Sequence, residues 1–335
     1  MPRLGPLESD FTAPPGIEIH DCGKAFAAWQ WYNYCDSRVP PGKQRLRINL
    51  DETAVCLYQG GRKGNVFISR ALERIQQGSL GTRRTFLTHV ALICDDPAVQ
   101  PLLPQFILVN RRTLPDDAEL AAIQAACPPN VIVLREKSAW VTNVVFMRMM
   151  RRLRVALAPV LRDRQPILIL DTASPHIARE VLWLCGGLGF WVVIAPAKLT
   201  WLLQPLDTDG FAQYKDRLQD AFQEAQMRAA GGAVGVRELI AAICTAVRYV
   251  LQGRLWASAF DRDGFGDAQG SLGARVVANL QIEEPLAIST DRPTHAQVKA
   301  CFPSNRLVYP ASVWRAFDAP PAVVVAHRLP WVRRG

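Results

Sequence analysis

Three aspartates, Asp51, Asp171 and Asp207, have the residue type and placement needed to bind divalent metal ions. Carboxylates without nearby Cys or His partners favour Mg²⁺ or Mn²⁺. Two such ions about 4 Å apart can activate an attacking water or hydroxyl and stabilise the leaving oxygen in phosphodiester chemistry. The alternative is that each acid merely caps a loop, which is the commoner role for any single Asp, and the spacing alone leaves both possibilities open.

Predicted strands position the first two aspartates. Residues 45–50 alternate polar and apolar side chains as a half-buried strand does, and Asp51 follows them. Residues 167–170 are apolar at every position, which is typical of a central strand covered on both faces, and Asp171 comes next. We expect a helix to start at Ser174-Pro175 and a strand at 190–195, which makes a parallel, right-handed βαβ unit.

The third aspartate precedes a predicted helix. Phe211, Tyr214, Leu218 and Phe222 have helical spacing, and Asp207 lies one turn before them. A helix N-terminus stabilises a negative charge, so this position favours the ionised carboxylate. Further predicted elements are strands at 54–58, 65–69, 85–94, 105–110 and 131–134, and helices at 141–161 and 236–255.

The helix predicted at 141–161 carries a basic surface. Six arginines lie largely outside its apolar stripe or just after it: Arg148, Arg151, Arg152, Arg154, Arg162 and Arg164. A solvated basic face is the preferred interpretation, and a DNA contact is the alternative. The formal net charge of +9 favours an acidic partner such as nucleic acid without requiring one.

Composition indicates a globular protein in a reducing compartment. The chain has 335 residues, of which 49% are hydrophobic, and its eight cysteines include no C-x-x-C pair. We therefore expect an intracellular protein with reduced thiols. No secretory signal is evident at the N-terminus, and glycines interrupt the apolar run 181–197, so no membrane association is expected.

The blocks around the three aspartates resemble a known family. LRINLDET at 46–53, ILILDTASPH at 167–176 and LTWLLQPLDTDGFAQYK at 199–215 are similar to the catalytic blocks of DDE superfamily endonucleases. The pogo/Tigger/jerky branch of transposases is the most similar type, because its third acid is also Asp and follows Gln-Pro-Leu or a similar sequence. Weaker similarity extends over 102–110, 138–146 and 255–265.

This resemblance implies an α/β, ribonuclease H-like fold with a mixed five-stranded sheet flanked by helices. It implies that Asp51, Asp171 and Asp207 are both metal ligands and catalytic residues of a nuclease and strand-transfer site with two Mg²⁺ or Mn²⁺ ions. DNA is the implied partner, the nucleus the implied location, and a synaptic homodimer the implied assembly. There is no Gly-rich phosphate-binding loop, so no nucleotide cofactor is expected.

The resemblance also implies supporting residues around the acids. Glu52 either assists the first ligand or is an exposed strand-end residue, and His176 either orients a ligand or packs locally. Gln204 is expected to position the loop of Asp207, and Asp209 is a competing third ligand. Thr172 departs from the family pattern, which has Asn directly after the second acid.

The expected organisation is an N-terminal extension (1–44), a catalytic domain (45–266) and an irregular C-terminal tail (267–335). A helix-turn-helix region normally precedes the catalytic domain in this family, and residues 1–44 do not provide one. We therefore expect weak DNA binding without end specificity, from a truncated, decayed or domesticated element. The alternative function is a catalytically inactive, domesticated DNA-binding or interaction module.

Overall fold

A six-stranded sheet forms the centre of the protein. The computed structural model describes residues 19–56, 86–228, 235–266, 274–280 and 288–303. The strands are β1 (Gln44–Cys56), β2 (Phe86–Cys94), β3 (Gln105–Asn110), β4 (Val131–Glu136), β5 (Arg164–Leu170) and β6 (Trp191–Ile194), in the spatial order β4-β3-β2-β1-β5-β6. The longest strand, β1, therefore lies inside the sheet, paired on both edges.

The sheet has the ribonuclease H-like arrangement. Strands β1, β2 and β3 form an antiparallel meander, whereas β5 pairs parallel to β1 and β6 parallel to β5. This confirms the predicted mixed sheet and the parallel βαβ unit. A sixth strand, β4, adds to the expected five by pairing parallel to β3, and α3 (Asp117–Ala126) forms the crossover that such a pair needs.

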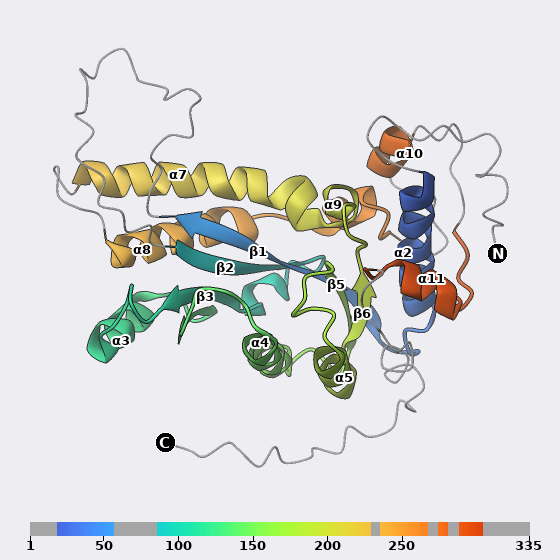
Figure 1. Cartoon of the computed structure of the whole chain (residues 1–335), viewed down its shortest axis with the longest axis horizontal. Coiled ribbons are helices and arrows are strands. Elements are labelled where there is room, and N and C mark those ends of the chain that lie inside the picture. The colour runs from blue at the N-terminus through green and yellow to red at the C-terminus, as the bar shows by residue number, and fades with distance from the viewer. Residues whose placement is uncertain (1–18, 57–85, 229–234, 267–273, 281–287, 304–335) are drawn as a thin grey trace.

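Helices cover both faces of the sheet (Figure 1). The long helix α7 (Phe211–Arg228) runs above it, and α4 (Asn143–Ala156) and α5 (Arg179–Gly187) lie below. His89 of β2 packs against Tyr214 of α7, with ring centroids 5.1 Å apart. The remaining helical segments are η1 (Gln100–Leu102), α6 (Thr200–Leu203), η2 (Leu206–Gly210), α8 (Val236–Ala246), η3 (Val247–Leu251), α9 (Ala257–Arg262), α10 (Ala274–Leu280) and α11 (His295–Ala300).

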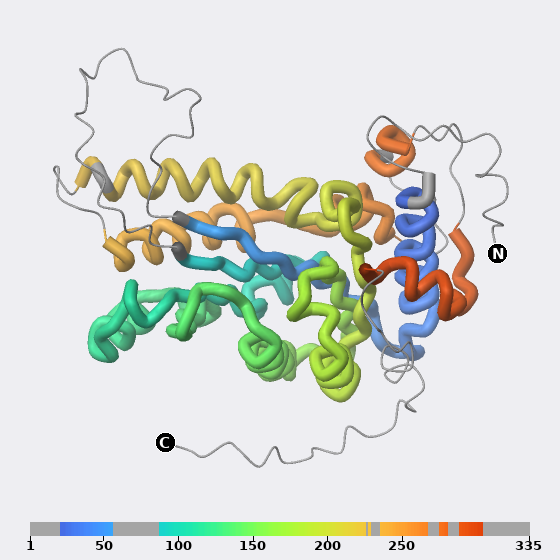
Figure 2. Tube along the Cα trace, in the orientation of Figure 1, coloured from blue at the N-terminus to red at the C-terminus, as the bar shows by residue number. Residues whose placement is uncertain are grey.

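Helix α2 (Ile19–Ser37), within the expected N-terminal extension, belongs to the core. Trp29, Trp31 and Tyr32 are fully buried, and Trp29 Nε1 donates to the carbonyl of Asp263 at 2.9 Å. Figure 2 shows α2 beside α11, so segments from opposite ends of the sequence pack together. Helices α10 and α11 also give structure to part of the tail that was expected to be irregular.

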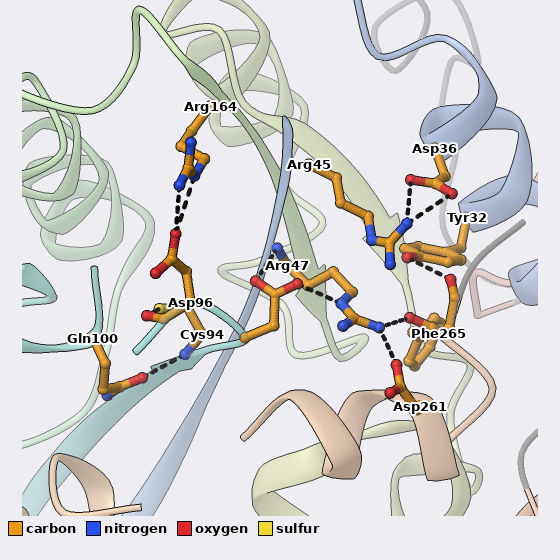
Figure 3. Close-up of polar contacts among 12 residues, drawn as sticks. Tyr32, Asp36, Arg45, Arg47, Cys94, Asp96, Gln100, Arg164, Asp261 and Phe265 are labelled. Carbon is orange, nitrogen blue, oxygen red and sulfur yellow. Dashed lines mark hydrogen bonds and ion pairs between the residues drawn. The ribbon is translucent and has the colours of Figure 1, made fainter. Parts of the chain in front are cut away.

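Arg47 ties the first half of β1 to its surroundings, four residues before Asp51. Its side chain is 3% exposed, and its Nε lies 2.6 Å from Asp95 Oδ2. Figure 3 shows the other end of the guanidinium, where it contacts the Asp261 carboxylate at 2.6 Å and donates to the carbonyl of Phe265. A buried charge requires such partners, so residues 261–265 are fixed against the start of β1.

Several predicted boundaries differ in the structure. The helix expected over 141–161 is α4, which ends at Ala156, and β1 continues through Asp51 to Cys56 instead of ending at Asp51. The helix expected from Ser174-Pro175 starts at Arg179, because residues 174–177 form a turn that carries His176 toward the end of β5. The helix expected over 236–255 ends as α8 at Ala246 and continues as the π-helical η3. The strand predicted at 65–69 lies outside the described residues.

The apolar run 181–197 forms α5 and β6. Among the described residues, no helix is long and apolar enough to cross a membrane.

Candidate functional site

Asp51 and Asp171 lie on adjacent parallel strands. The β1–β5 register pairs Asn49 with Ile169, so two further residues on each strand bring Asp51 level with Asp171. Asp51 is 8% exposed on the interior strand β1, and Asp171 follows the last residue of β5. The middle of β1 thus lies beside the end of β5, which is why two acids distant in sequence come together here.

Asp207 lies close enough to act electrostatically on Asp51. It is exposed and belongs to η2, the π-helical segment that leads into α7. Burial, followed by the charges of Asp207 and Asp171, raises the pKa of Asp51 to about 8. The three predicted acids are therefore near one another, and their mutual repulsion falls on the most buried of them.

Asn49 connects the three acid-bearing segments. Its fully buried amide donates to the carbonyl of Ile169 and to Gln204 Oε1, each at 3.0 Å. Its Oδ1 accepts from the backbone N–H of Leu206 at 2.9 Å. Ile169 and Leu206 precede Asp171 and Asp207 by two residues and one residue, so this side chain sets the relative position of both acids against β1.

Gln204, predicted to position the Asp207 loop, is fully buried and makes the contact with Asn49. Asn49 itself was missed at the sequence level. Its signal was its place in the strand, because residues two apart face the same side and Asn49 therefore shares a side with Asp51.

His176 bridges Asp171 and Glu52. Its Nδ1 contacts Asp171 Oδ1, its Nε2 lies 3.3 Å from Glu52 Oε1, and its buried ring packs on Phe146 at 4.5 Å between centroids. Burial alone would lower the pKa of His176, but the two carboxylates outweigh it and raise the pKa to about 10. The structure thus brings His176 and Glu52 to the acid cluster, on the face opposite Asn49.

The Asp171 carboxylate is held by its own loop. Its Oδ1 also accepts from the backbone N–H of Ala173 at 2.9 Å. Burial raises its pKa, but the hydrogen bond and charge of His176, together with the Ala173 N–H, produce a net lowering. These contacts favour the ionised form of the Asp171 carboxylate, whereas burial favours the protonated form of Asp51.

Asp209 is engaged by cations from later in the chain. Its two carboxylate oxygens each lie 3.0 Å from a guanidinium nitrogen, one of Arg275 and one of Arg262. Thr208 Oγ1 donates at 2.7 Å to the fully buried Asp263, which also lies 3.5 Å from Arg275 Nη1. These contacts disfavour Asp209 as the third ligand and fix η2 so that Asp207 remains exposed.

The carboxylates of Asp51, Asp171 and Asp207 are chemically suited to bind a hard divalent cation. Their arrangement in this structure is not that of a formed metal site. Within the described residues, no group of three or more His, Cys, Asp or Glu side chains is already disposed to hold a metal ion. Burial is the largest cause of the raised pKa of Asp51, and the charges of Asp207 and Asp171 add to it; a bound cation would offset the repulsion between these carboxylates.

Solved structures similar to this chain are complexes of one transposase. They are the Mos1 transposase paired-end complex with left transposon end (13% identity, TM-score 0.39), the Mos1 mariner paired end complex with Mn (12%, 0.37) and a pre-cleavage Mos1 transpososome (12%, 0.38). Each match covers 76% of this chain and 65% of the other. No protein-family profile and no curated protein matches. The assignment of the fold rests on the strand order and directions rather than on these likenesses.

Proposed function

We propose that this chain is a transposase-derived DDE endonuclease domain that cleaves or joins DNA phosphodiester bonds with Mg²⁺ or Mn²⁺. The observation that supports it is the placement of Asp51 in a buried position beside Asp171 and Asp207, where burial and then the charges of Asp207 and Asp171 raise the pKa of Asp51 to about 8. A carboxylate cluster of this kind is what hard cations bind.

Each residue has a proposed role. Asp51, Asp171 and Asp207 would hold the ions, which supply an activated water or hydroxyl and stabilisation of the leaving oxygen. His176 orients the Asp171 carboxylate through Nδ1 and balances Glu52 through Nε2. Asn49 and Gln204 hold the Asp207 segment against β1.

Within the DDE endonucleases, the proposed type is pogo/Tigger/jerky. The sequence Gln204-Pro205-Leu206-Asp207 in the third block supports it. DNA is the proposed substrate, with the nucleus as the proposed location and a homodimer as the proposed assembly. The exposed Arg151, Arg152 and Arg162 supply positive charge for phosphate contacts.

The test is nicking of supercoiled plasmid and joining of oligonucleotides by purified protein with Mn²⁺, Mg²⁺ or chelator. Activity should require the metal and fall by about 100-fold or more in Asp51→Asn, Asp171→Asn and Asp207→Asn, because each removes a proposed ligand. Asp209→Asn is the matched control on the same segment and should retain metal dependence. Equal activity in wild type and Asp171→Asn would contradict the proposal.

A second candidate is a DNA-binding module that keeps the fold but not the activity. It is favoured by the engagement of Asp171 with His176 and by the lack of a preformed metal-holding group in the described parts of the chain. It predicts salt-sensitive DNA binding that neither Mg²⁺ nor Asp51→Asn changes, since phosphate binding by Arg and Lys needs no metal. Filter binding across a salt series distinguishes the two functions.

A further inference from the structure

A cavity away from the acid cluster contains two facing thiols. Its volume is about 450 Å³, and helices α3, α7 and α8 line it together with η3. Cys127, which caps the C-terminus of α3, and Cys244 of α8 have their Sγ atoms 3.8 Å apart. Both residues are partly exposed, whereas Cys22, Cys35, Cys94, Cys185 and Cys301 are buried. This pair is therefore accessible in a way that those five thiols are not.

The surroundings of the pair are basic. Arg217, Arg237 and Arg248 line the cavity, against the single acid Glu224. On the α8–η3 helix, Arg237 and Arg248 lie seven residues before and four residues after Cys244, which places all three on one helical face. Positive charge near a thiol favours the thiolate, which is the reactive form.

The two thiols are not equivalent. The hydrogen bond from the Cys244 S–H lowers the pKa of Cys127, and the same contact raises the pKa of Cys244. Cys127 is thus the thiol that more readily forms a thiolate, and Cys244 lies within reach of its sulfur for a second attack. A disulfide requires the sulfurs to approach to about 2.05 Å, a small movement for side chains that already face each other.

We propose that Cys127 and Cys244 form a reversible dithiol–disulfide site that reacts with carboxylate-bearing small-molecule disulfides admitted to the cavity. The Cys127 thiolate attacks one sulfur of the reagent, forming a mixed disulfide and releasing one thiolate. Cys244 then attacks the Cys127 sulfur, loses its proton to water, and displaces the second thiolate. The protein is oxidised by two electrons, and the reagent is reduced to two thiols. The product links α3 to α8 and is independent of any phosphodiester chemistry.

Glutathione disulfide is the test reagent because it carries carboxylates. The folded full chain is incubated with it, quenched in acid and alkylated, and its cysteine peptides are mapped by mass spectrometry. A Cys127–Cys244 peptide that dithiothreitol reverses is expected. The proposal is overturned if both thiols remain alkylatable under conditions that oxidise most of an equimolar dithiothreitol reference.

Two cysteine variants test which thiol attacks first. A cationic disulfide reagent tests whether the arginines select for carboxylates. Cys244→Ser should trap glutathione on Cys127 at a rate near that of wild type, whereas Cys127→Ser removes the proposed first nucleophile and should react more slowly. Cystamine, a cationic disulfide, should oxidise wild type more slowly than glutathione disulfide, and Arg248→Gln should narrow that difference. Equal rates for the two reagents would overturn the proposed selectivity. Near-ultraviolet circular dichroism confirms that each variant is folded.

Discussion

Asn49 accepts a hydrogen bond at 2.9 Å from the backbone N–H of Leu206, a residue far away in sequence that directly precedes Asp207. The same side chain donates to β5 through the carbonyl of Ile169. One buried amide therefore holds the first and second acid-bearing strands and the third acid-bearing turn in register.

Asn49→Ala should lower the free energy of unfolding by about 1–3 kcal/mol, because the N–H of Leu206 and the Gln204 amide oxygen lose a buried partner. Urea unfolding followed by circular dichroism measures this change. Gln204→Ala and the double variant complete a cycle whose coupling energy should be nonzero. An unchanged unfolding midpoint in Asn49→Ala would show that the contact does not hold the segments together.

Asp51→Asn should stabilise the metal-free protein at pH 7. Burial and the charges of Asp207 and Asp171 raise the pKa of Asp51 to about 8, so the native state binds more protons than the unfolded chain between about pH 4 and pH 8. Stability therefore falls as the pH rises through that window, and the neutral amide removes the effect. We expect a gain of at least about 1.4 kcal/mol, the equivalent of one pKa unit.

The effect of Mn²⁺ on the melting temperatures of wild type and Asp51→Asn is a control for the role of Asp51 as a metal ligand. Added Mn²⁺ should raise the melting temperature of wild type, because an ion that binds only the native state stabilises it. It should have little effect on Asp51→Asn, which lacks a proposed ligand. Differential scanning fluorimetry over an Mn²⁺ series measures both responses, and equal shifts in the two proteins would count against Asp51 as a ligand.

His176→Gln should flatten the pH dependence of stability on the alkaline side. The pKa of His176 is raised to about 10 by Asp171 and Glu52, against the lowering effect of burial. The stabilisation from its charge is complete below the unfolded pKa of about 6.5, and it is lost as the pH rises through the folded pKa near 10. The free energy of unfolding, measured by denaturant unfolding at several pH values in this range, should fall as the pH rises in wild type. It should fall less steeply in His176→Gln.

Arg47→Ala should be strongly destabilising, by about 3–5 kcal/mol, because it leaves the Asp95 carboxylate without its buried guanidinium partner. Arg45→Ala is the matched control on the same strand. Its pair with Asp36 is longer, at 3.4 Å, and its side chain is 26% exposed, so we expect about 1 kcal/mol or less. Guanidinium unfolding of the two variants compares them, and similar losses would contradict the distinction drawn from burial.

Much of the sheet could be predicted from the sequence, because local periodicity determines which segments become strands. The alternation at 45–50 and the continuous apolar run at 167–170 correspond to β1 and β5, and 105–110 matches β3 in both bounds. Asp171 follows the end of β5 as expected, whereas Asp51, also expected at a strand end, lies within β1, which continues to Cys56.

The contacts that decide the site depend on packing between segments distant in the sequence. Asp207 and Asp209 are two residues apart in one helical turn, and only Arg262 and Arg275 show which carboxylate is neutralised within the protein. Likewise, Asn49 is an ordinary strand residue in the sequence, and a helix start at Ser174 was expected where the chain instead forms the turn of His176.

The sequence by itself determined the elements and the three acids, because backbone periodicity and residue type are local properties. The tertiary structure decided which buried polar groups find partners across the sheet, and hence that Asn49 and His176 hold the acids in place.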